Sequence, residues 1–193
     1  MLMLQIRKAE SEDAATLAKL HADYIRESFP EHRGSTEEEI REDLLSGKQG
    51  IRVLMALKSG QPVGFLTWDH VYDSHWASSA GEINDLYVCP DKRGEGIAVA
   101  LIAQMAADVR AEGGKFIRGR AYDRNSPVGH LYERLAVGHD SAECHLSSDA
   151  FEEMAKLAGL PVREIARRAP PKAWNFGKPK GDVEMGAEET DRR

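Results

Sequence analysis

Two glycines and an arginine lie close together in Val88–Ala98, between an apolar run and a helical pattern. Gly94 and Gly96 allow a ligand to approach the main chain closely. Backbone N–H groups at the start of a helix have no partner within it, and the helix dipole adds positive potential there. Arg93 would add a fixed positive charge beside them. The segment therefore predicts a site for a phosphate or pyrophosphate group.

Two common phosphate-binding motifs do not describe this segment. G-x-x-x-x-G-K-[ST] does not occur, which excludes a P-loop, and the glycine spacing differs from the G-x-G-x-x-G of dinucleotide folds. The segment instead contains Arg-x-x-Gly-x-Ala, at Arg93, Gly96 and Ala98, preceded by Leu86-Tyr87-Val88 and Pro90. This string resembles the coenzyme A signature of the GNAT superfamily of acetyl-CoA-dependent N-acetyltransferases.

A second motif, Asn125–Leu135, strengthens the resemblance. GNAT proteins carry Asn-x-x-Ala-x-x-Leu-Tyr-Glu-Lys/Arg-x-Gly-Phe after their fifth strand. The matching residues in this chain are Asn125, Leu131, Tyr132, Glu133 and Arg134. Val128 replaces the usual Ala, and Ala136-Val137 replaces Gly-Phe, which indicates a variant junction after the helix. The resemblance extends from about residue 4 to residue 137.

The resemblance implies an α/β fold, with a central mixed sheet flanked by helices on both faces. It implies transfer of an acetyl group from acetyl-CoA to a primary amine by direct attack in a ternary complex. The acceptor would be a small cationic amine or the exposed amino group of a protein. The residues that the resemblance assigns to the coenzyme are Leu86, Tyr87, Val88, Arg93, Gly94, Gly96, Ile97, Ala98 and Asn125.

Tyr132 is the candidate general acid. A phenol has a reference pKa of about 10, so it can donate a proton to a departing thiolate whose thiol has a pKa near 8.5. Family members use the matching tyrosine in this role. The alternative is that Tyr132 only packs its ring and makes a hydrogen bond through its hydroxyl.

Two carboxylates are candidates for the general base that takes a proton from the amine. Glu82 stands eleven positions before Arg93, an offset at which some GNAT enzymes have their glutamate base. Asp85 is the rival, and strand alternation predicts that it lies on the opposite face from Glu82. A chain of water molecules without a dedicated base is the third alternative.

Composition narrows the class of protein. The chain has 193 residues, 41% of them hydrophobic, which suffices for one full core. Its net charge of -6 argues against nucleic acid as a partner, and the absence of a long apolar run argues against a membrane span. Cys89 and Cys144 are isolated and the histidines are scattered, so we expect no metal, no disulfide and a cytoplasmic location.

Hydrophobic periodicity and turn residues predict the order of elements. Ser11 is expected to cap the first helix, Thr36-x-x-Glu39 to open the second as a capping box, and Ser59-Gly60 to form a hairpin turn. The predicted strands are residues 4–7, 51–57, 63–68, 83–88, 116–122 and 142–146. The predicted helices are residues 11–29, 36–45, 97–112, 127–135 and 148–159, followed by a short one to about residue 168.

Three regions follow from this order. Residues 1–137 are expected to form the acetyltransferase core, 138–176 a C-terminal strand and helical extension packed on it, and 177–193 a disordered tail. An apolar stripe of Phe151, Met154 and Leu157 must be covered, which favours a homodimer. The alternative function is a GNAT-fold protein that binds acyl-CoA without catalysis.

Acidic residues suggest the charge of the acceptor. Glu31, Glu37, Glu38, Glu39, Glu42 and Asp43 gather between the first two helices, and Asp69, Asp73 and Glu82 are expected on the same side. Such a surface raises the local concentration of cations. A solvated acidic helix face is the alternative interpretation.

Overall fold

The computed structural model describes residues 4–121, 127–135, 137–138 and 143–169. Within these residues, seven strands form one sheet in the order β1-β2-β3-β4-β5-β7-β6. Only β4 and β5 run parallel, and the other neighbours are antiparallel. The strands are β1 (Leu4–Lys8), β2 (Arg52–Lys58), β3 (Gln61–Asp73), β4 (Ser78–Val88), β5 (Phe116–Arg120), β6 (Val137–Gly138) and β7 (Glu143–Ser147). The predicted mixed sheet is confirmed.

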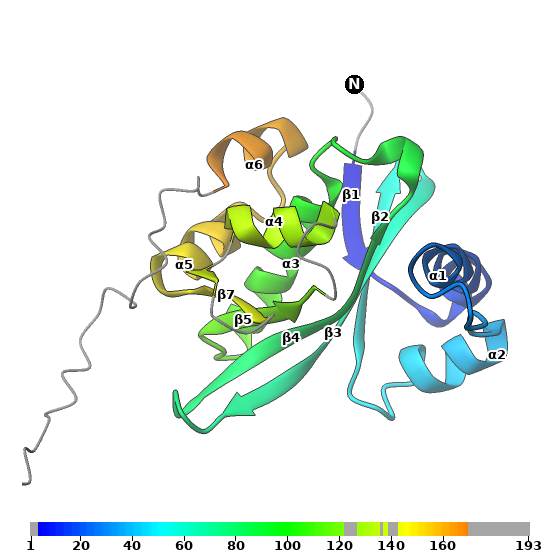
Figure 1. Ribbon diagram of the computed structural model, residues 1–193, viewed down its shortest axis with the longest axis horizontal. Helices are drawn as coiled ribbons and strands as arrows, with labels where there is room; N and C mark the ends of the chain where they lie inside the picture. Colours follow the sequence, from blue (N-terminus) through cyan, green and yellow to red (C-terminus); the bar gives the residue numbers. More distant parts are fainter. Residues whose placement is uncertain (1–3, 122–126, 136, 139–142, 170–193) are drawn as a thin grey trace, which may run out of the picture.

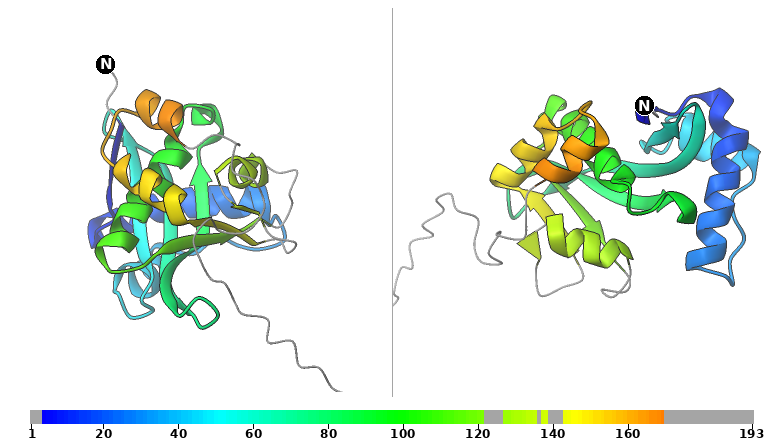
Figure 2. Two further views of the ribbon diagram at one scale, coloured as in Figure 1. Left: turned by 90° about the vertical axis from the view of Figure 1, so that its left-hand side faces the viewer. Right: turned by 90° about the horizontal axis from the view of Figure 1, so that it is seen from above.

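Helices cover both faces of the sheet, as predicted (Figure 1). One face carries α1 (Ala14–Ser28) and α2 (Glu37–Glu39), which continues as a π-helical turn over Ile40–Leu45. The other face carries α3 (Ile97–Ala111), α4 (Pro127–Leu135), α5 (Ser148–Lys156) and α6 (Val162–Arg168). Figure 2 shows the two groups of helices on opposite sides of the sheet. None of the described helices combines the length and apolar character needed to cross a membrane.

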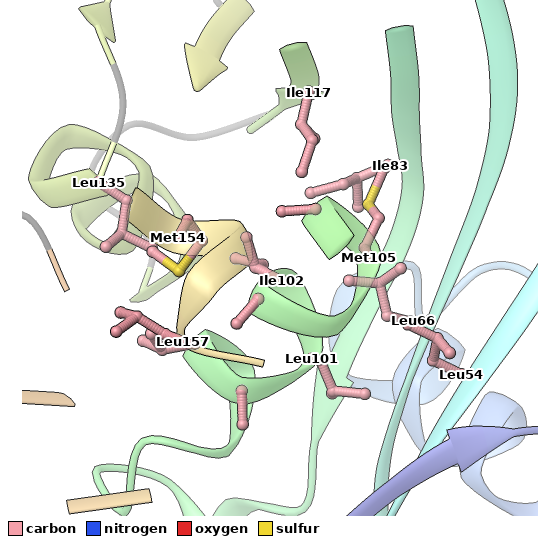
Figure 3. Close-up of a cluster of buried hydrophobic side chains, with 14 of the residues drawn as sticks. Leu54, Leu66, Ile83, Leu101, Ile102, Met105, Ile117, Leu135, Met154 and Leu157 are labelled. Carbon is pink, nitrogen blue, oxygen red and sulfur yellow. The ribbon is translucent and has the colours of Figure 1, made fainter. Parts of the chain in front are cut away.

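The larger core lies between the sheet and α3 (Figure 3). Helix α3 is apolar on most of its surface, because strands cover one side of it and α5 the other. Phe151, Met154 and Leu157 are each at most 1% exposed in this core. The stripe that led us to expect a homodimer is therefore covered by its own chain. The dimer stays a prediction without that support.

A second, smaller core lies on the opposite face, under α1. Leu17 and Leu20 of the helix pack there against Met55, Phe65 and Tyr87 of the sheet. The two cores fix which side of each strand faces which helices, since side chains alternate along a strand. The core that a strand residue joins therefore shows which helices its neighbours along the strand face.

Local sequence signals correctly predicted most ends of the helices and strands. Thr36 and Glu39 form the predicted capping box, and Ser59 and Gly60 both have positive φ in the turn between β2 and β3. The first helix starts differently, because Glu10 and not Ser11 is the N-cap of a short 3-10 turn, Ser11–Asp13. Strands β3 and β4 extend well beyond their predicted ends. The added residues, which lie toward the turn that joins the two strands, include many polar ones, so the apolar pattern that predicts a strand does not continue there.

The segment beyond residue 137 supplies β7 and α5, which complete the sheet and the larger core. The proposed division into a core and an extension at that residue remains a prediction. The predicted tail, 177–193, lies outside the described residues.

Candidate functional site

The predicted junction of strand, glycine turn and helix is present between β4 and α3. Gly94 and Gly96 have φ of +77° and +83°, in the left-handed region that favours glycine. Gly96 is the N-cap of α3, and no side chain caps the helix. The N–H groups of Ile97 and Ala98, in the first turn of α3, therefore have no partner within the helix. This arrangement suits an anion.

The two glycines have different surroundings. A Cβ placed on Gly94 would meet nothing within 4 Å, so the turn is open at this residue. A Cβ placed on Gly96 would lie 2.7 Å from Cγ1 of Val162, at the start of α6. Gly94 thus leaves room for a ligand, whereas Gly96 lets α6 pack closely against the turn.

Arg93 does not project freely beside the turn. Its Nε donates to the carbonyl oxygen of Val88 at 3.0 Å, and its guanidinium lies 2.7 Å from a carboxylate oxygen of Glu27 on α1. The same group lies 5.8 Å from the centre of the Tyr87 ring. The hydrogen bond and charge of Glu27 raise the pKa of Arg93 above its usual value. In this conformation Arg93 ties the turn to α1.

Strand β4 loses its neighbour β5 halfway along its length. The parallel pairing ends at Ile83 and Gly119, whereas β4 continues to Val88. Beyond that point the edge of β4 that faces β5 has no strand partner in the described part of the chain. The side chains of Leu86 and Val88 pack into the larger core and that of Tyr87 into the smaller one. Main-chain groups of successive strand residues point to opposite edges, and the Cys89 N–H bonds the Val63 carbonyl oxygen of β3. Of the three predicted residues, Leu86 and Val88 therefore direct main-chain groups to the free edge, whereas those of Tyr87 face its register partner Phe65 on β3.

Tyr132 lies where β4 and β5 part. The side chain is 5% exposed and belongs to the larger core. A Cβ placed on Gly119 would lie only 2.8 Å from its hydroxyl oxygen, so the hydroxyl rests against this glycine. Gly119 is not among the site residues predicted from the sequence. Its signal was an isolated glycine inside a strand, which often marks close approach of another group.

Glu82 and Asp85 lie on the same face of the sheet, so the alternation argument that separated them is wrong. Trp68 pairs with Ile83 while Thr67 pairs with Asp85, which leaves Asn84 as an extra residue in β4. This β-bulge shifts the alternation by one residue. Ile83 points into the larger core, so its neighbour Glu82 points to the α1 face. Asp85 shares that face with Tyr87, which packs into the smaller core under α1.

The two carboxylates have different partners. Glu82 is held by Arg118, with a nitrogen–oxygen distance of 2.6 Å, and by Arg120 at 3.5 Å. Asp85 accepts a hydrogen bond from the Thr67 hydroxyl at 2.8 Å and donates its own N–H to that hydroxyl at 3.0 Å. Glu82 is thus part of an ion-pair cluster, whereas Asp85 is oriented by a neutral partner. The sequence signal for Thr67 was a polar residue within an apolar run.

His21 of α1 adds an imidazole near Asp85, which the sequence analysis did not foresee. Its Nδ1 accepts a hydrogen bond from the Ser35 backbone N–H at 3.2 Å, and its ring centre lies 6.2 Å from that of Phe65. Burial lowers the pKa of His21, and the negative charge of Asp85 opposes that shift. No sequence motif marks this histidine, because α1 and β4 meet only in the folded chain.

Asn125, the remaining predicted coenzyme residue, lies outside the described residues, as does Ala136 of the variant junction.

Residues 17–136, more than half of the chain, match the model of the acetyltransferase (GNAT) family. A search of curated proteins found no match.

Several solved structures share the fold. A ribosomal-protein-alanine N-acetyltransferase from Brucella melitensis biovar Abortus 2308 is 28% identical, with a TM-score of 0.60, 72% of this chain covered and 94% of that chain. An aminoglycoside acetyltransferase from an uncultured soil metagenomic sample is 24% identical, with a TM-score of 0.59 and coverages of 72% and 95%. The PaiA N-acetyltransferase from Thermoplasma acidophilum, solved in complex with coenzyme A, is 16% identical, with a TM-score of 0.58 and coverages of 75% and 97%. The family match and the shared fold together establish that this chain belongs to the GNAT acetyltransferase family.

Proposed function

We propose that the protein is an acetyl-CoA-dependent N-acetyltransferase that acts on a cationic primary amine. The observation that carries the proposal is that three structural features adjoin one another. The open glycine turn at the start of α3 leads to the unpartnered edge of β4, and that edge begins where the Tyr132 hydroxyl rests on Gly119.

The chemical groups of coenzyme A match these three features. Its diphosphate would accept hydrogen bonds from the N–H groups around Gly94, Gly96, Ile97 and Ala98, where no side chain competes as a cap. Its pantetheine arm carries amide groups, which would pair with the main chain of Leu86–Val88 as an added strand does. Acetyl-CoA supplies an acetyl thioester, whose C–S bond breaks as the amine nitrogen forms the new amide bond.

Tyr132 is the proposed general acid. It lies on the α3 side of the sheet at the end of the β4–β5 pairing, which is where the arm would place the sulfur. Its hydroxyl would donate a proton to the departing thiolate, so that coenzyme A leaves as the free thiol. The phenolate would then regain a proton from solvent.

Asp85 is the proposed general base, in preference to Glu82. Glu82 already faces the guanidinium groups of Arg118 and Arg120. Asp85 lies at the bulge, two residues beyond the end of the β4–β5 pairing, and Thr67 fixes its orientation. The amine would approach from the α1 face and lose its proton to Asp85, while the thioester reaches the same point from the α3 face. Acid and base would thus act from opposite sides of the sheet.

A row of carboxylates on the α1 face supports a cationic acceptor. Asp69 is the register partner of Glu82, and Asp73 follows on the same face of β3. Oδ1 of Asp69 is buried and has no hydrogen-bond partner among the described residues. A buried carboxylate oxygen without a partner is costly, so an ammonium group on the substrate would relieve it.

The acidic segment between the first helices contributes less than its sequence suggested. Glu37 pairs with Arg41 at 2.5 Å, and Glu39 pairs with Arg33 at the same distance. These pairs cancel part of the charge. On β3 and β4, Glu82 and Asp73 are likewise paired with Arg118. The proposed attraction for cations therefore rests on Asp69 and Asp85, next to the reacting groups.

An acceptor screen tests the proposal. Wild-type protein and acetyl-CoA are mixed with a polyamine, an aminoglycoside, a lysine derivative, a peptide with a free N-terminus, and neutral and acidic amines, and release of free thiol is followed. We expect release with at least one cationic amine. Release only with neutral or acidic amines would contradict the substrate class. Coenzyme binding without release from any amine would favour a non-catalytic acyl-CoA-binding protein.

A further inference from the structure

The phosphate-binding turn carries several cations, but each has a carboxylate partner. Arg93 pairs with Glu27, and Lys92 with Asp91 at 2.5 Å. Lys58, the last residue of β2 in the same sheet, pairs with Glu95. Main-chain N–H groups therefore remain, but the turn has no net positive charge from its own side chains. The several negative charges on coenzyme A phosphates call for a cation from elsewhere.

Helix α6 is the element that packs against this turn. A Cβ on Gly96 would lie 2.7 Å from Val162 Cγ1 and 3.5 Å from Ala166 Cβ, so both side chains face the N-cap of α3. Ile165, on the adjoining side of the helix, is 2% exposed and belongs to the larger core. These contacts fix the rotation of α6 about its own axis. Figure 1 shows α6 beside the turn that joins β4 to α3.

The rotation places two arginines on the flank next to the turn. Successive residues of a helix are about 100° apart. Arg163 and Arg167 therefore share the side that adjoins Val162 and Ala166 and lies away from Ile165. Arg168 lies on the other side of the helix, where it pairs with Glu164 at 3.1 Å.

Both flanking arginines are exposed, and neither has an ion pair with a carboxylate in the described ranges. A guanidinium presents a fork of donors that matches two oxygens of a phosphate. Because α6 touches Gly96, two residues beyond Gly94, the long side chain of an arginine on this flank could extend toward a group bound at the turn.

We propose that Arg163 and Arg167 bind the phosphate groups of coenzyme A from outside the core motif. The proposal rests on the proposed function, since it assigns further residues to the same coenzyme. It gives α6 a second role, because the helix packs against the N-cap of α3 and also supplies cations that no carboxylate of the turn neutralises.

Isothermal titration calorimetry with coenzyme A and with dephospho-coenzyme A tests the proposal. The Arg163→Ala/Arg167→Ala variant should bind coenzyme A at least about tenfold more weakly, since charged hydrogen bonds to two guanidiniums are lost. Its affinity should also depend less on salt, because fewer ionic contacts remain. The control, Arg168→Ala, should bind like wild type.

Comparison of the two ligands shows which phosphate group the arginines bind. A loss confined to coenzyme A assigns the arginines to the 3′-phosphate, whereas an equal loss for both ligands assigns them to the diphosphate. The variant Arg163→Lys/Arg167→Lys keeps the charge but not the guanidinium fork, so it should lose less affinity than the alanine pair, which separates binding from a disturbed fold. Unchanged affinity and salt dependence in the alanine pair would overturn this inference. Failure of wild-type protein to bind coenzyme A would instead overturn the proposed function.

Discussion

At the scale of single residues, Tyr132 is the most direct test of the chemistry. Tyr132→Phe removes the hydroxyl and keeps the ring that fills the core. Loss of one positioned proton donor should lower kcat by ~10²–10⁴-fold and leave the affinity for coenzyme A nearly unchanged. Steady-state kinetics and calorimetry on the same sample measure the two effects. A variant with wild-type kcat would show that Tyr132 only packs, or that another step limits the rate.

Gly119 offers a second route to the same hydroxyl. A Cβ there would come within 2.8 Å of the Tyr132 oxygen, so Gly119→Ala should push the hydroxyl away from the end of the β4–β5 pairing. We expect kcat to fall in this variant although the tyrosine is intact. Combining Gly119→Ala with Tyr132→Phe should then cost little beyond either change alone, because both remove the same interaction. Additive losses would show that Gly119 acts independently of Tyr132.

His21 makes stability depend on pH. Burial lowers its pKa in the folded protein, so the unfolded chain binds a proton more readily. Below the unfolded value of about 6.5, protonation therefore favours unfolding, and this loss grows until pH falls to the folded pKa. Urea unfolding as a function of pH should show stability rising through this window. His21→Gln should flatten that part of the curve, whereas an unchanged slope would show that other groups cause it.

At the scale of elements, the two glycines of the turn form a matched pair. Both have φ near +80°, but only Gly96 faces Val162. Gly94→Ala should cost about 1 kcal/mol in the free energy of unfolding, from the left-handed conformation alone. Gly96→Ala should cost more, because α6 must also move away. Adding Val162→Ala should recover part of that extra cost, and chemical denaturation of the four proteins measures it. Equal losses at both glycines would contradict the close packing of α6.

At the scale of elements, the features that could be predicted from the sequence are those set by neighbouring residues. The glycine turn, the capping box at Thr36 and the apolar stripe of α3 are local signals, and the structure has each of them where the sequence indicated. The bulge at Asn84 has no local signal, because it arises from pairing with β3. One extra residue there reversed the predicted face of Asp85.

The ion-pair and packing partners of side chains also could not be predicted from the sequence. Arg93 stands in the motif as a cation for phosphate, but its partner Glu27 lies on α1, 66 residues earlier in the chain. The Phe151 stripe needed a cover, and α3 provides it within the same chain. Pairings of this kind depend on tertiary contacts, which a periodic pattern does not encode.

At the scale of the whole molecule, the proposed function places its two substrates on opposite sides of the sheet. The coenzyme would lie on the side of α3, α4 and α6, and the amine on the side of α1, with the end of the β4–β5 pairing as their meeting point. This arrangement would allow direct attack in a ternary complex, because both substrates could be bound at the same time. Charge is divided in the same way. Arg163 and Arg167 flank the coenzyme side, whereas Asp69 and Asp85 lie on the amine side beside the ion pairs that Glu82 and Asp73 make with Arg118.

This division predicts how salt affects the reaction. A surface of one charge speeds the encounter with a substrate of the opposite charge, and salt screens that attraction beyond about 8 Å at physiological ionic strength. For a cationic acceptor, kcat/KM should therefore fall as salt is added under saturating acetyl-CoA, whereas a neutral acceptor should show little change. Asp69→Asn keeps the shape of the side chain and removes one charge, so it should lower kcat/KM for the cation and make its salt dependence shallower. The matched control is Glu38→Gln on the exposed start of α2, away from the row on β3 and β4. If both substitutions reduced the salt dependence equally, the attraction would come from the overall charge of -6 and not from the carboxylate row.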